Sequence, residues 1–307
     1  MSKNFWSNLE KPILALAPLA GFTDSAYRQI ASSFGAQVVY SEMVSATALF
    51  YDSAETISLM DFDSKKEKNY VVQLFGSEPE HFARAAKIIS EQVKPAGLDL
   101  NCGCPVKKVL KQGAGASLMS DYKKTRQIIR AILETTNLPL SIKIRAGAGK
   151  TNALKFLDKL SDLDIKAVMI HGRTLAGAFS GPVDLKLIRA AKQHFPGIVL
   201  ANGGINSPED IDLVLQATQA DGVGIARGAM GNPWIFKRQA RPGVKEIFKL
   251  MKQHAKLVHQ LKGDNGLVEL RKHLVYYVNG LEGASQLRAS LVRVNSLADL
   301  DRVLFNT

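Results

Sequence analysis

Cysteine is scarce in this chain of 307 residues, which contains only Cys102 and Cys104. Two cysteines cannot form a disulfide framework, and a bridge between residues so close in sequence would be strained, so a reducing cytoplasm is the expected location. A zinc site is also not expected, because there is no second cysteine pair and the nearest downstream histidine is His171. The sequence therefore predicts neither a disulfide nor a bound metal.

Long hydrophobic runs are missing as well. No stretch approaches the roughly 18 consecutive apolar residues that span a bilayer, so a membrane is not expected as a partner. The run Pro12–Ala20 is short and contains Pro18, and we interpret it as a first buried strand rather than a signal peptide. Hydrophobic residues still make up 46% of the chain, which is enough for a large core.

Acidic residues are few compared with basic ones. The chain has 28 Asp and Glu against 40 Lys and Arg, which gives a formal net charge of +12. An excess of this size favours a polyanionic partner such as nucleic acid or an anionic membrane surface. A generally basic proteome would explain the charge equally well.

Short apolar runs alternate with amphipathic segments as far as about residue 236. The apolar runs are Ile13–Leu16, Gln37–Tyr40, Val71–Leu74, Gly97–Asn101, Leu140–Ile144, Ala167–His171, Ile198–Ala201 and Gly222–Ile225. The amphipathic segments are Ser25–Phe34, Pro79–Val93, Tyr122–Thr135, Leu154–Leu163, Leu185–His194 and Pro208–Ala217, with N-caps expected at Asp24, Asp121, Asp184 and Ser207. Strands that are apolar throughout are typical of a parallel sheet buried on both faces. Eight such units predict an α/β fold, the (β/α)8 TIM barrel.

The pattern changes after Phe236, and only helical periodicity follows. We expect a barrel domain over residues 1–237, a linker over 238–243 and a small all-helical domain over 244–307. Its expected helices are Val244–Leu261, Leu267–Val278, Ala284–Val292 and Leu297–Leu304. Residues 241–307 contain 11 Lys and Arg against 6 Asp and Glu. This surplus would suit RNA binding, although an ordinary solvated helix face explains it nearly as well.

Residues that can carry chemistry follow the predicted strands, at the barrel end where TIM-barrel active sites lie. In chain order they are Pro18, Leu19, Ala20, Gln73, Asn101, Cys104, Lys143, Arg145, His171, Arg173, Asn202, Gly203, Gly204, Ala226 and Arg227. Glycines after the seventh and eighth strands indicate a phosphate site, because they let backbone amides approach an oxyanion. Tight loop geometry with a surface arginine is the alternative.

Three of these residues allow more than one interpretation. Lys143 alternates with Ile142 and Ile144, so it should point into the barrel and face either a carboxylate or a ligand anion. His171 could be a satisfied core histidine, but the adjacent Gly172–Thr174 favours a ligand contact. An ordinary thiol has a pKa of about 8.5, so Cys104 could act as an acid at neutral pH. A thiolate nucleophile and an inert buried side chain are the other possibilities for Cys104, and Cys102 is expected to be structural.

The stretch Asn101–Met119, which begins Asn-Cys-Gly-Cys-Pro-Val-Lys-Lys, resembles the signature of the tRNA-dihydrouridine synthases. Weaker matches occur in the family's order at Ala17–Asp24, Ser41–Met43, Gln73–Gly76, Lys143–Arg145, His171–Thr174, Asn202–Gly204 and Ala226–Gly228. The resemblance covers essentially the whole chain. It implies an FMN-binding TIM barrel followed by a helical domain that helps to hold tRNA.

The resemblance also implies a role for each residue. Pro18, Leu19, Ala20 and Gln73 would contact the flavin ring, Lys143 would lie near its N1/O2 edge, and His171, Asn202, Gly203, Gly204, Ala226 and Arg227 would hold FMN, chiefly around its phosphate. With NADPH or NADH as reductant, hydride would pass from FMN to C6 of uracil while Cys104 protonates C5. Asn101, Lys107, Lys108, Arg145 and Arg173 would contact tRNA. The chain departs from the family pattern at Cys102, usually Met, Phe or Ala, at Gly204, often Asp, and at Ala226, often Gly.

Two other functions fit parts of the sequence. An FMN-dependent TIM-barrel dehydrogenase of a small molecule would need neither the high positive charge nor the helical appendage. A non-catalytic tRNA-binding protein would not need Cys104, Lys143 and His171 together. A tRNA-dihydrouridine synthase, expected to be a monomer, accounts for all of these features.

Overall fold

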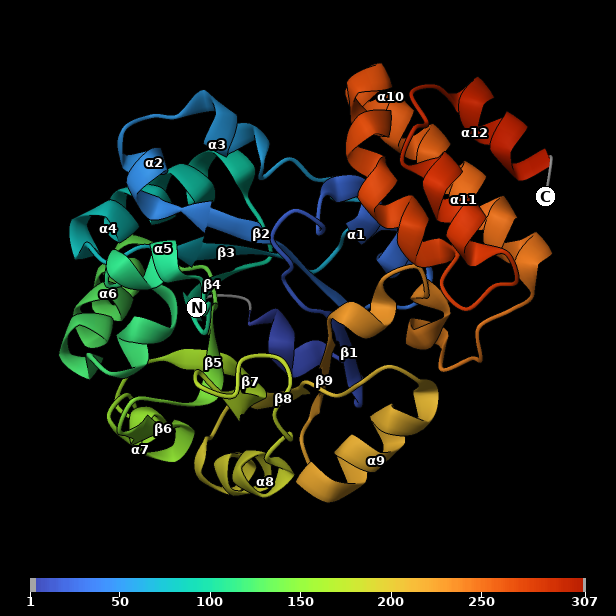
Figure 1. Ribbon diagram of the computed structural model, residues 1–307. Coiled ribbons are helices and arrows are strands. Elements are labelled where there is room, and N and C mark those ends of the chain that lie inside the picture. Colours follow the sequence, from blue (N-terminus) through green and yellow to red (C-terminus); the bar gives the residue numbers. More distant parts are fainter. Residues whose placement is uncertain (1–3, 306–307) are drawn as a thin grey trace.

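A closed barrel of parallel strands forms the centre of the computed structural model, which describes residues 4–305 (Figure 1). Its strands within that range are β1 (Ile13–Leu16), β2 (Val38–Ser45), β3 (Tyr70–Phe75), β4 (Gly97–Cys102), β5 (Leu140–Ala148), β7 (Ile165–Thr174), β8 (Ile198–Asn202) and β9 (Gly222–Ile225). Each strand pairs in parallel with the next, and β1 pairs with both β2 and β9, which closes the ring. The TIM barrel predicted from the sequence is therefore confirmed.

The strand after residue 140 is longer than predicted. β5 continues to Ala148 and forms a small antiparallel hairpin with β6 (Thr151–Asn152). The segment Gly147–Thr151, whose Gly-Lys-Thr ending superficially suggests a phosphate-binding loop, therefore belongs mostly to this hairpin. Gly149, with φ of 57°, occupies its turn.

Helices surround the barrel and pack against its outer face (Figure 1). They are α1 (Ser25–Ser33), α2 (Ala46–Phe50), α3 (Ala54–Ser58), α4 (Pro79–Ile88), α5 (Lys107–Lys111), α6 (Tyr122–Thr135), α7 (Ala153–Asp158), α8 (Leu185–His194) and α9 (Pro208–Thr218). The four expected N-caps are confirmed, because each side chain accepts a hydrogen bond from a backbone N–H in the first turn. The helix expected to end at Leu163 instead ends at Asp158, and the short helices α2, α3 and α5 were not predicted.

The amino-terminal end of the barrel is closed by a side chain. A 3-10 helix at Phe5–Asn8 places Trp6, which is 1% exposed, against the barrel interior. Trp6 packs there with residues of the strands, including Ile13, Val38 and Val71. This apolar packing leaves the carboxyl end of the barrel for a polar site.

The C-terminal region is helical, as predicted, and consists of α10 (Val244–Tyr277), α11 (Ala284–Leu291) and α12 (Leu297–Phe305). α10 changes direction at Gly263, where φ is 64° and ψ is −158°. In a straight helix, residues 254 and 277 would lie about 34 Å apart, yet His254 Nδ1 lies 3.1 Å from the Tyr277 hydroxyl. The two halves of α10 therefore pack side by side and correspond to the two separate helices expected from the sequence.

The helical region packs on the barrel beside α1, as Figure 1 shows. Ala26 and Ile30 of α1 belong to the same buried cluster as Leu250, Leu270 and other residues of α10. Phe22, just before α1, makes edge contacts with the rings of His273 and Tyr276. The helical region thus lies next to the carboxyl end of the barrel. No helix within residues 4–305 has the length and apolarity that crossing a membrane requires.

Candidate active site

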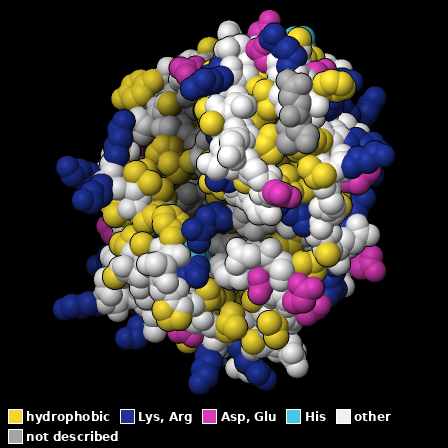
Figure 2. Space-filling view, turned by 45° about the vertical axis from the view of Figure 1, so that its right-hand side comes forward, with side chains coloured by type: hydrophobic (Ala, Val, Ile, Leu, Met, Phe, Trp, Pro, Cys, Tyr) yellow, Lys and Arg dark blue, Asp and Glu magenta, His cyan; other side chains and the backbone are white. Residues whose placement is uncertain are grey.

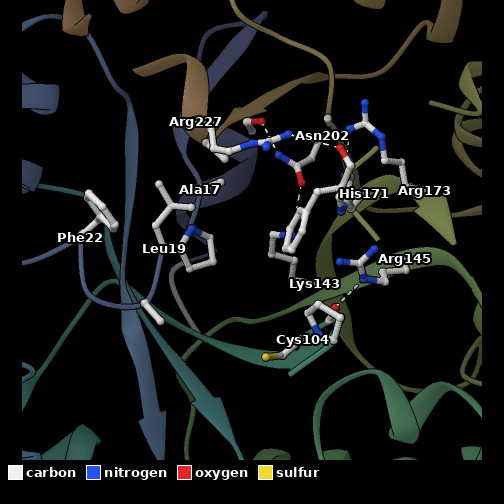
Figure 3. Close-up of a pocket in the computed structure, with 18 of the residues that line it drawn as sticks. Ala17, Leu19, Phe22, Cys104, Lys143, Arg145, His171, Arg173, Asn202 and Arg227 are labelled. Atoms are coloured by element: carbon white, nitrogen blue, oxygen red, sulfur yellow. Dashed lines mark hydrogen bonds between the residues drawn. The ribbon is translucent and has the colours of Figure 1, made fainter. Parts of the chain in front are cut away.

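A cavity of about 410 Å³ opens at the carboxyl end of the barrel (Figure 3). This size lies within the range of small-molecule and cofactor sites. The site residues expected from the sequence line it, with the exception of Lys107 and Lys108: they are Pro18, Leu19, Ala20, Gln73, Asn101, Cys104, Lys143, Arg145, His171, Arg173, Asn202, Gly203, Gly204, Ala226 and Arg227. Strand ends that are far apart in the sequence thus contribute to one chamber.

Cys104 lies on the wall of this cavity, on the turn that follows β4. The side-chain oxygen of Asn101 accepts hydrogen bonds from the backbone N–H groups of Gly103 at 3.1 Å and Cys104 at 2.9 Å, which turns the chain back at the strand end. The Cys104 carbonyl accepts from Ala116 N–H at 3.1 Å. Gly115 is required beside it, because a Cβ there would lie 2.8 Å from the Cys104 carbonyl oxygen. Cys102, by contrast, is fully buried in the core between the barrel and its helices.

Lys143 projects from β5 into the cavity (Figure 3), where its Nζ donates to Asn202 Oδ1 at 3.3 Å. Asn202 is held in turn by its donation to the Gly224 carbonyl at 2.6 Å. Burial lowers the pKa of Lys143 to about 8, although the nearby Asp99 carboxylate opposes this shift. Asp99, a residue of the protein itself, thus supplies a negative charge near Lys143, but no carboxylate within residues 4–305 forms an ion pair with this ammonium.

Lys143 and three arginines make the cavity strongly basic around His171. Burial, together with the positive charges of Lys143, Arg145, Arg173 and Arg227, lowers the pKa of His171 to about 3. His171 is consequently neutral at pH 7, and its Nε2 lies 3.4 Å from Arg173 Nη1, a group that can only donate. The chamber therefore combines a neutral imidazole with fixed positive charge, a combination that suits an anionic ligand.

The loops after β8 and β9 approach the cavity closely with their backbone. Gly203 has φ of 106°, and a Cβ there would lie 2.7 Å from the His171 ring. A Cβ at Gly228 would lie 2.2 Å from the Ile205 carbonyl oxygen. Only glycine fits these two positions, and exposed backbone beside Arg173 and Arg227 is the arrangement that binds phosphate in TIM barrels. The residues present thus fit a phosphorylated cofactor.

Arg145 binds loop carbonyls rather than projecting into solvent. The residue is 2% exposed, and its guanidinium donates to the carbonyls of Gly103 at 2.7 Å, Thr174 at 3.1 Å and Ala178 at 2.9 Å. These bonds link the Cys104 turn to the loop after β7. Its expected contact with tRNA stays a prediction.

Two residues were not predicted from the sequence: Phe179, which lines the cavity, and Asp99, which lies behind its wall. Asp99 precedes Asn101 by two positions on β4, so strand alternation places both on the inner face and could have revealed it. Phe179 lines the cavity while 54% exposed, with the guanidinium carbons of Arg145 and Arg227 5.5 and 5.6 Å from its ring centroid. No sequence pattern marks Phe179, because the loop after β7 is placed by tertiary hydrogen bonds.

Lys107 and Lys108 lie outside the cavity, exposed on the short helix α5 that follows the Cys104 turn. Figure 2 shows Lys and Arg side chains beside a hollow on one face of the molecule.

No group of three or more His, Cys, Asp or Glu side chains that could hold a metal occurs in the described part of the chain.

Comparison with known proteins agrees with this geometry. The sequence model of the dihydrouridine synthase (Dus) family matches residues 15–305. A probable tRNA-dihydrouridine synthase of Helicobacter pylori is 34% identical over 306 residues, covering 96% of this chain and 93% of the relative. The tRNA-dihydrouridine synthase B of Pseudomonas syringae is 34% identical over 294 residues, covering 92% and 87%.

The barrel also resembles solved structures of much lower identity. Histamine dehydrogenase from Rhizobium sp. 4-9 superimposes with a TM-score of 0.57 at 13% identity, over 80% of this chain and 48% of the other. Such a likeness concerns the fold alone, whereas the family model and the relatives extend over nearly the whole sequence. The chain belongs to the dihydrouridine synthase family.

Proposed function

We propose that this protein reduces the C5–C6 double bond of specific uridines in tRNA, with FMN as its cofactor and NADPH or NADH as the reductant. Family membership supports this activity, and so do the names of the relatives, which are tRNA-dihydrouridine synthases. The observation that carries the proposal is the Cys104 side chain on the wall of a basic cavity that also holds Lys143 and the glycine loops after β8 and β9.

The cavity offers separate surfaces for the parts of FMN. Gly203, Gly204, Ala226 and Arg227 would hold its phosphate, with neutral His171 beside them. Pro18, Leu19, Ala20 and Gln73 would contact the ring, and the Lys143 ammonium would stabilise negative charge there. When bound and reduced, FMN supplies the hydride that adds to C6 of uracil.

Cys104 would supply the proton. The S–H bond breaks as the new C5–H bond forms, and the electron pair left on sulfur makes a thiolate. Lys143 and Arg145 lie close enough to interact electrostatically with Cys104, so their charges stabilise that thiolate. The turn held by Asn101 fixes the position of the thiol.

The tRNA would approach the cavity mouth from the side of the helical region. The target uridine must leave its base stack to reach the chamber. Lys107 and Lys108 on α5, together with the basic residues of α10, α11 and α12, would contact phosphates. The two free cysteines agree with a reducing cytoplasm, where tRNA is found.

The test begins with the absorption spectrum of the purified protein and identification of the chromophore released by heat. FMN should be released, and the protein should convert uridines of unmodified tRNA to dihydrouridine when NADPH is added. A protein that is colourless and does not take up added FMN would refute the proposal.

Cys104→Ala tests the acid role, with Cys102→Ala as the matched control because that thiol is buried away from the cavity. Cys104→Ala should form dihydrouridine at least about a hundredfold more slowly, within the usual contribution of a general acid. Its oxidation of NADPH in the absence of tRNA should stay at the wild-type rate. Unchanged product formation by Cys104→Ala would exclude the acid role.

A further inference from the structure

A chain of buried side chains connects Asp99 to the catalytic turn. Asp99 Oδ2 accepts from Gln73 Nε2 at 2.7 Å, and Gln73 Oε1 accepts from Asn101 Nδ2 at 2.8 Å. Asn101 Oδ1 then accepts from Cys104 N–H at 2.9 Å. Asp99, Gln73 and Asn101 are 1%, 1% and 7% exposed, so water has little access to the chain of bonds.

The two ends of this chain determine how its middle is oriented. A carboxylate can only accept hydrogen bonds, and a backbone N–H can only donate one. With Asp99 at one end and Cys104 N–H at the other, both intervening amides have a single orientation in which every bond pairs a donor with an acceptor. Turning either amide over would place two donors or two acceptors face to face, which is costly in a buried site.

We propose that Asp99 is a positioning residue, and that its carboxylate sets the amide orientations of Gln73 and Asn101 and thereby the place of the Cys104 thiol. Asp99 does not line the cavity, so it acts through the residues that do. This inference rests on the proposed function, since it concerns the same proton donor. The nearby Lys143 would provide a different role for Asp99, as a counter-charge, and the two roles are separable.

The variants Asp99→Asn and Asp99→Leu distinguish the positioning role from the counter-charge role. In Asp99→Asn the side-chain oxygen can still accept from Gln73 while the new NH2 group donates to Ser141. The Ser141 hydroxyl now donates to Asp99 at 2.6 Å and lies 3.3 Å from the Leu98 carbonyl, to which it can donate instead. Asp99→Leu keeps the branched shape of the side chain, although it is larger, and leaves Gln73 without an acceptor. A positioning role therefore needs an acceptor at residue 99, whereas a counter-charge role needs the charge.

Two measurements on the full-length protein report on the position of the Cys104 turn. The first compares the rate of NADPH oxidation in the absence of tRNA with the rate of hydride transfer from the reduced protein to tRNA. The second is the rate at which iodoacetamide alkylates Cys104, which requires no turnover of the cofactor; Cys102 is buried and should not react. Asp99→Leu should slow the transfer to tRNA at least about tenfold, since small misplacements of catalytic groups have large effects. It should also change the alkylation rate, and it should slow NADPH oxidation less than it slows the transfer to tRNA.

Asp99→Asn should remain within about threefold of wild type in all three measurements. Equal defects in Asp99→Asn and Asp99→Leu would overturn the proposal in favour of the counter-charge role. Asp221→Leu is the control for removing a buried carboxylate, because Asp221 pairs with Lys11 and Lys192 away from the cavity. Asp221→Leu should lower the stability of the protein without changing the ratio of NADPH oxidation to hydride transfer to tRNA.

A double variant, which exchanges the acid and the amide between positions 99 and 101, keeps the proposal testable if Asp99→Leu does not fold. Burial raises the pKa of Asp99 to about 6, so the experiment is done at pH 8 to keep carboxylates ionised. Under these conditions the carboxylate of Asn101→Asp cannot donate to Gln73, so the turn should be displaced and Cys104 alkylation altered. Adding Asp99→Asn allows the Gln73 amide to turn over, and every group in the chain of bonds is again paired. The double variant should therefore regain most of the wild-type alkylation rate, and failure to do so would contradict the proposed coupling. If the wild-type protein forms no dihydrouridine, the proposed function fails, whatever these alkylation rates show.

Discussion

Acidification should destabilise the junction between the barrel and the helical region through buried histidines. His254 and His273, from the two halves of α10, are 0% and 3% exposed, and their ring centroids lie 5.1 Å apart. Neither Nε2 has a hydrogen-bond partner among residues 4–305. Tyr27 of α1 packs against both rings, which links the pair to the barrel. A proton added to either ring would create a buried charge, and its desolvation outweighs the opposing attraction of the Asp24 carboxylate.

The magnitude follows from the pKa of His254. Burial lowers that pKa from 6.5 to about 4, so the unfolded chain binds the proton more tightly than the folded protein. Stability is therefore highest above pH 6.5 and falls as the pH decreases toward 4. Linkage gives a loss of about 2 kcal/mol at pH 5 from His254 alone. Burial also lowers the pKa of His273 well below its ordinary value, which adds to the loss. The pKa of Asp24 is lowered to about 2 despite burial, chiefly by Lys262, so this carboxylate stays charged throughout the range.

The assay is urea unfolding at pH 7.5 and pH 5, followed by far-UV circular dichroism. His254→Gln removes the titrating group, so its free energy of unfolding should depend less on pH than that of wild type, by about 2 kcal/mol over this interval. His194→Gln, at an exposed position near the end of α8, should leave the pH dependence of wild type unchanged. The reasoning is refuted if His254→Gln and wild type lose the same free energy between the two pH values.

Two further predictions concern the ligand sites. Gly228→Ala should weaken FMN binding at least about tenfold, because its Cβ would lie 2.2 Å from the Ile205 carbonyl oxygen and must displace the loop; fluorescence titration measures the change. Gly243→Ala, whose Cβ would meet nothing within 4 Å, is the control, and equal affinities in the two variants would contradict this role of the loop. Replacing Lys107 and Lys108 with Glu should weaken tRNA binding and lower the slope of log affinity against log salt by about one per lysine that contacts a phosphate. An unchanged slope would show that the tRNA phosphates do not contact Lys107 and Lys108.

Much of the fold was predictable because its signals are local. The strands are short and largely apolar, and several helices begin at a side chain, such as Asp24 or Ser207, that caps them. These preferences act over a few residues and do not depend on the rest of the chain. Predictions were weaker where structure depends on packing, as at α7, which ends at Asp158 rather than Leu163.

The membership of the cavity was also largely predictable, since parallel strands bring their carboxyl ends to one rim. The hydrogen bonds and charge interactions within the cavity were not predictable in this way. The sequence predicted a carboxylate or a ligand anion facing Lys143 without identifying Asp99 as a nearby negative charge, and it did not show that the Arg145 guanidinium donates to three backbone carbonyls.

The sequence by itself thus determined the barrel, the rim on which the chemistry lies and the family to which the chain belongs. Only the tertiary structure decided that Phe179 reaches the cavity, that Asp99 orients the amides behind Cys104, and that His254 and His273 meet beside α1. The physical reason is that strand and helix patterns reflect burial and backbone hydrogen bonding, which neighbouring residues specify. Hydrogen-bond orientation and charge pairing depend on side chains that folding brings together from distant parts of the chain.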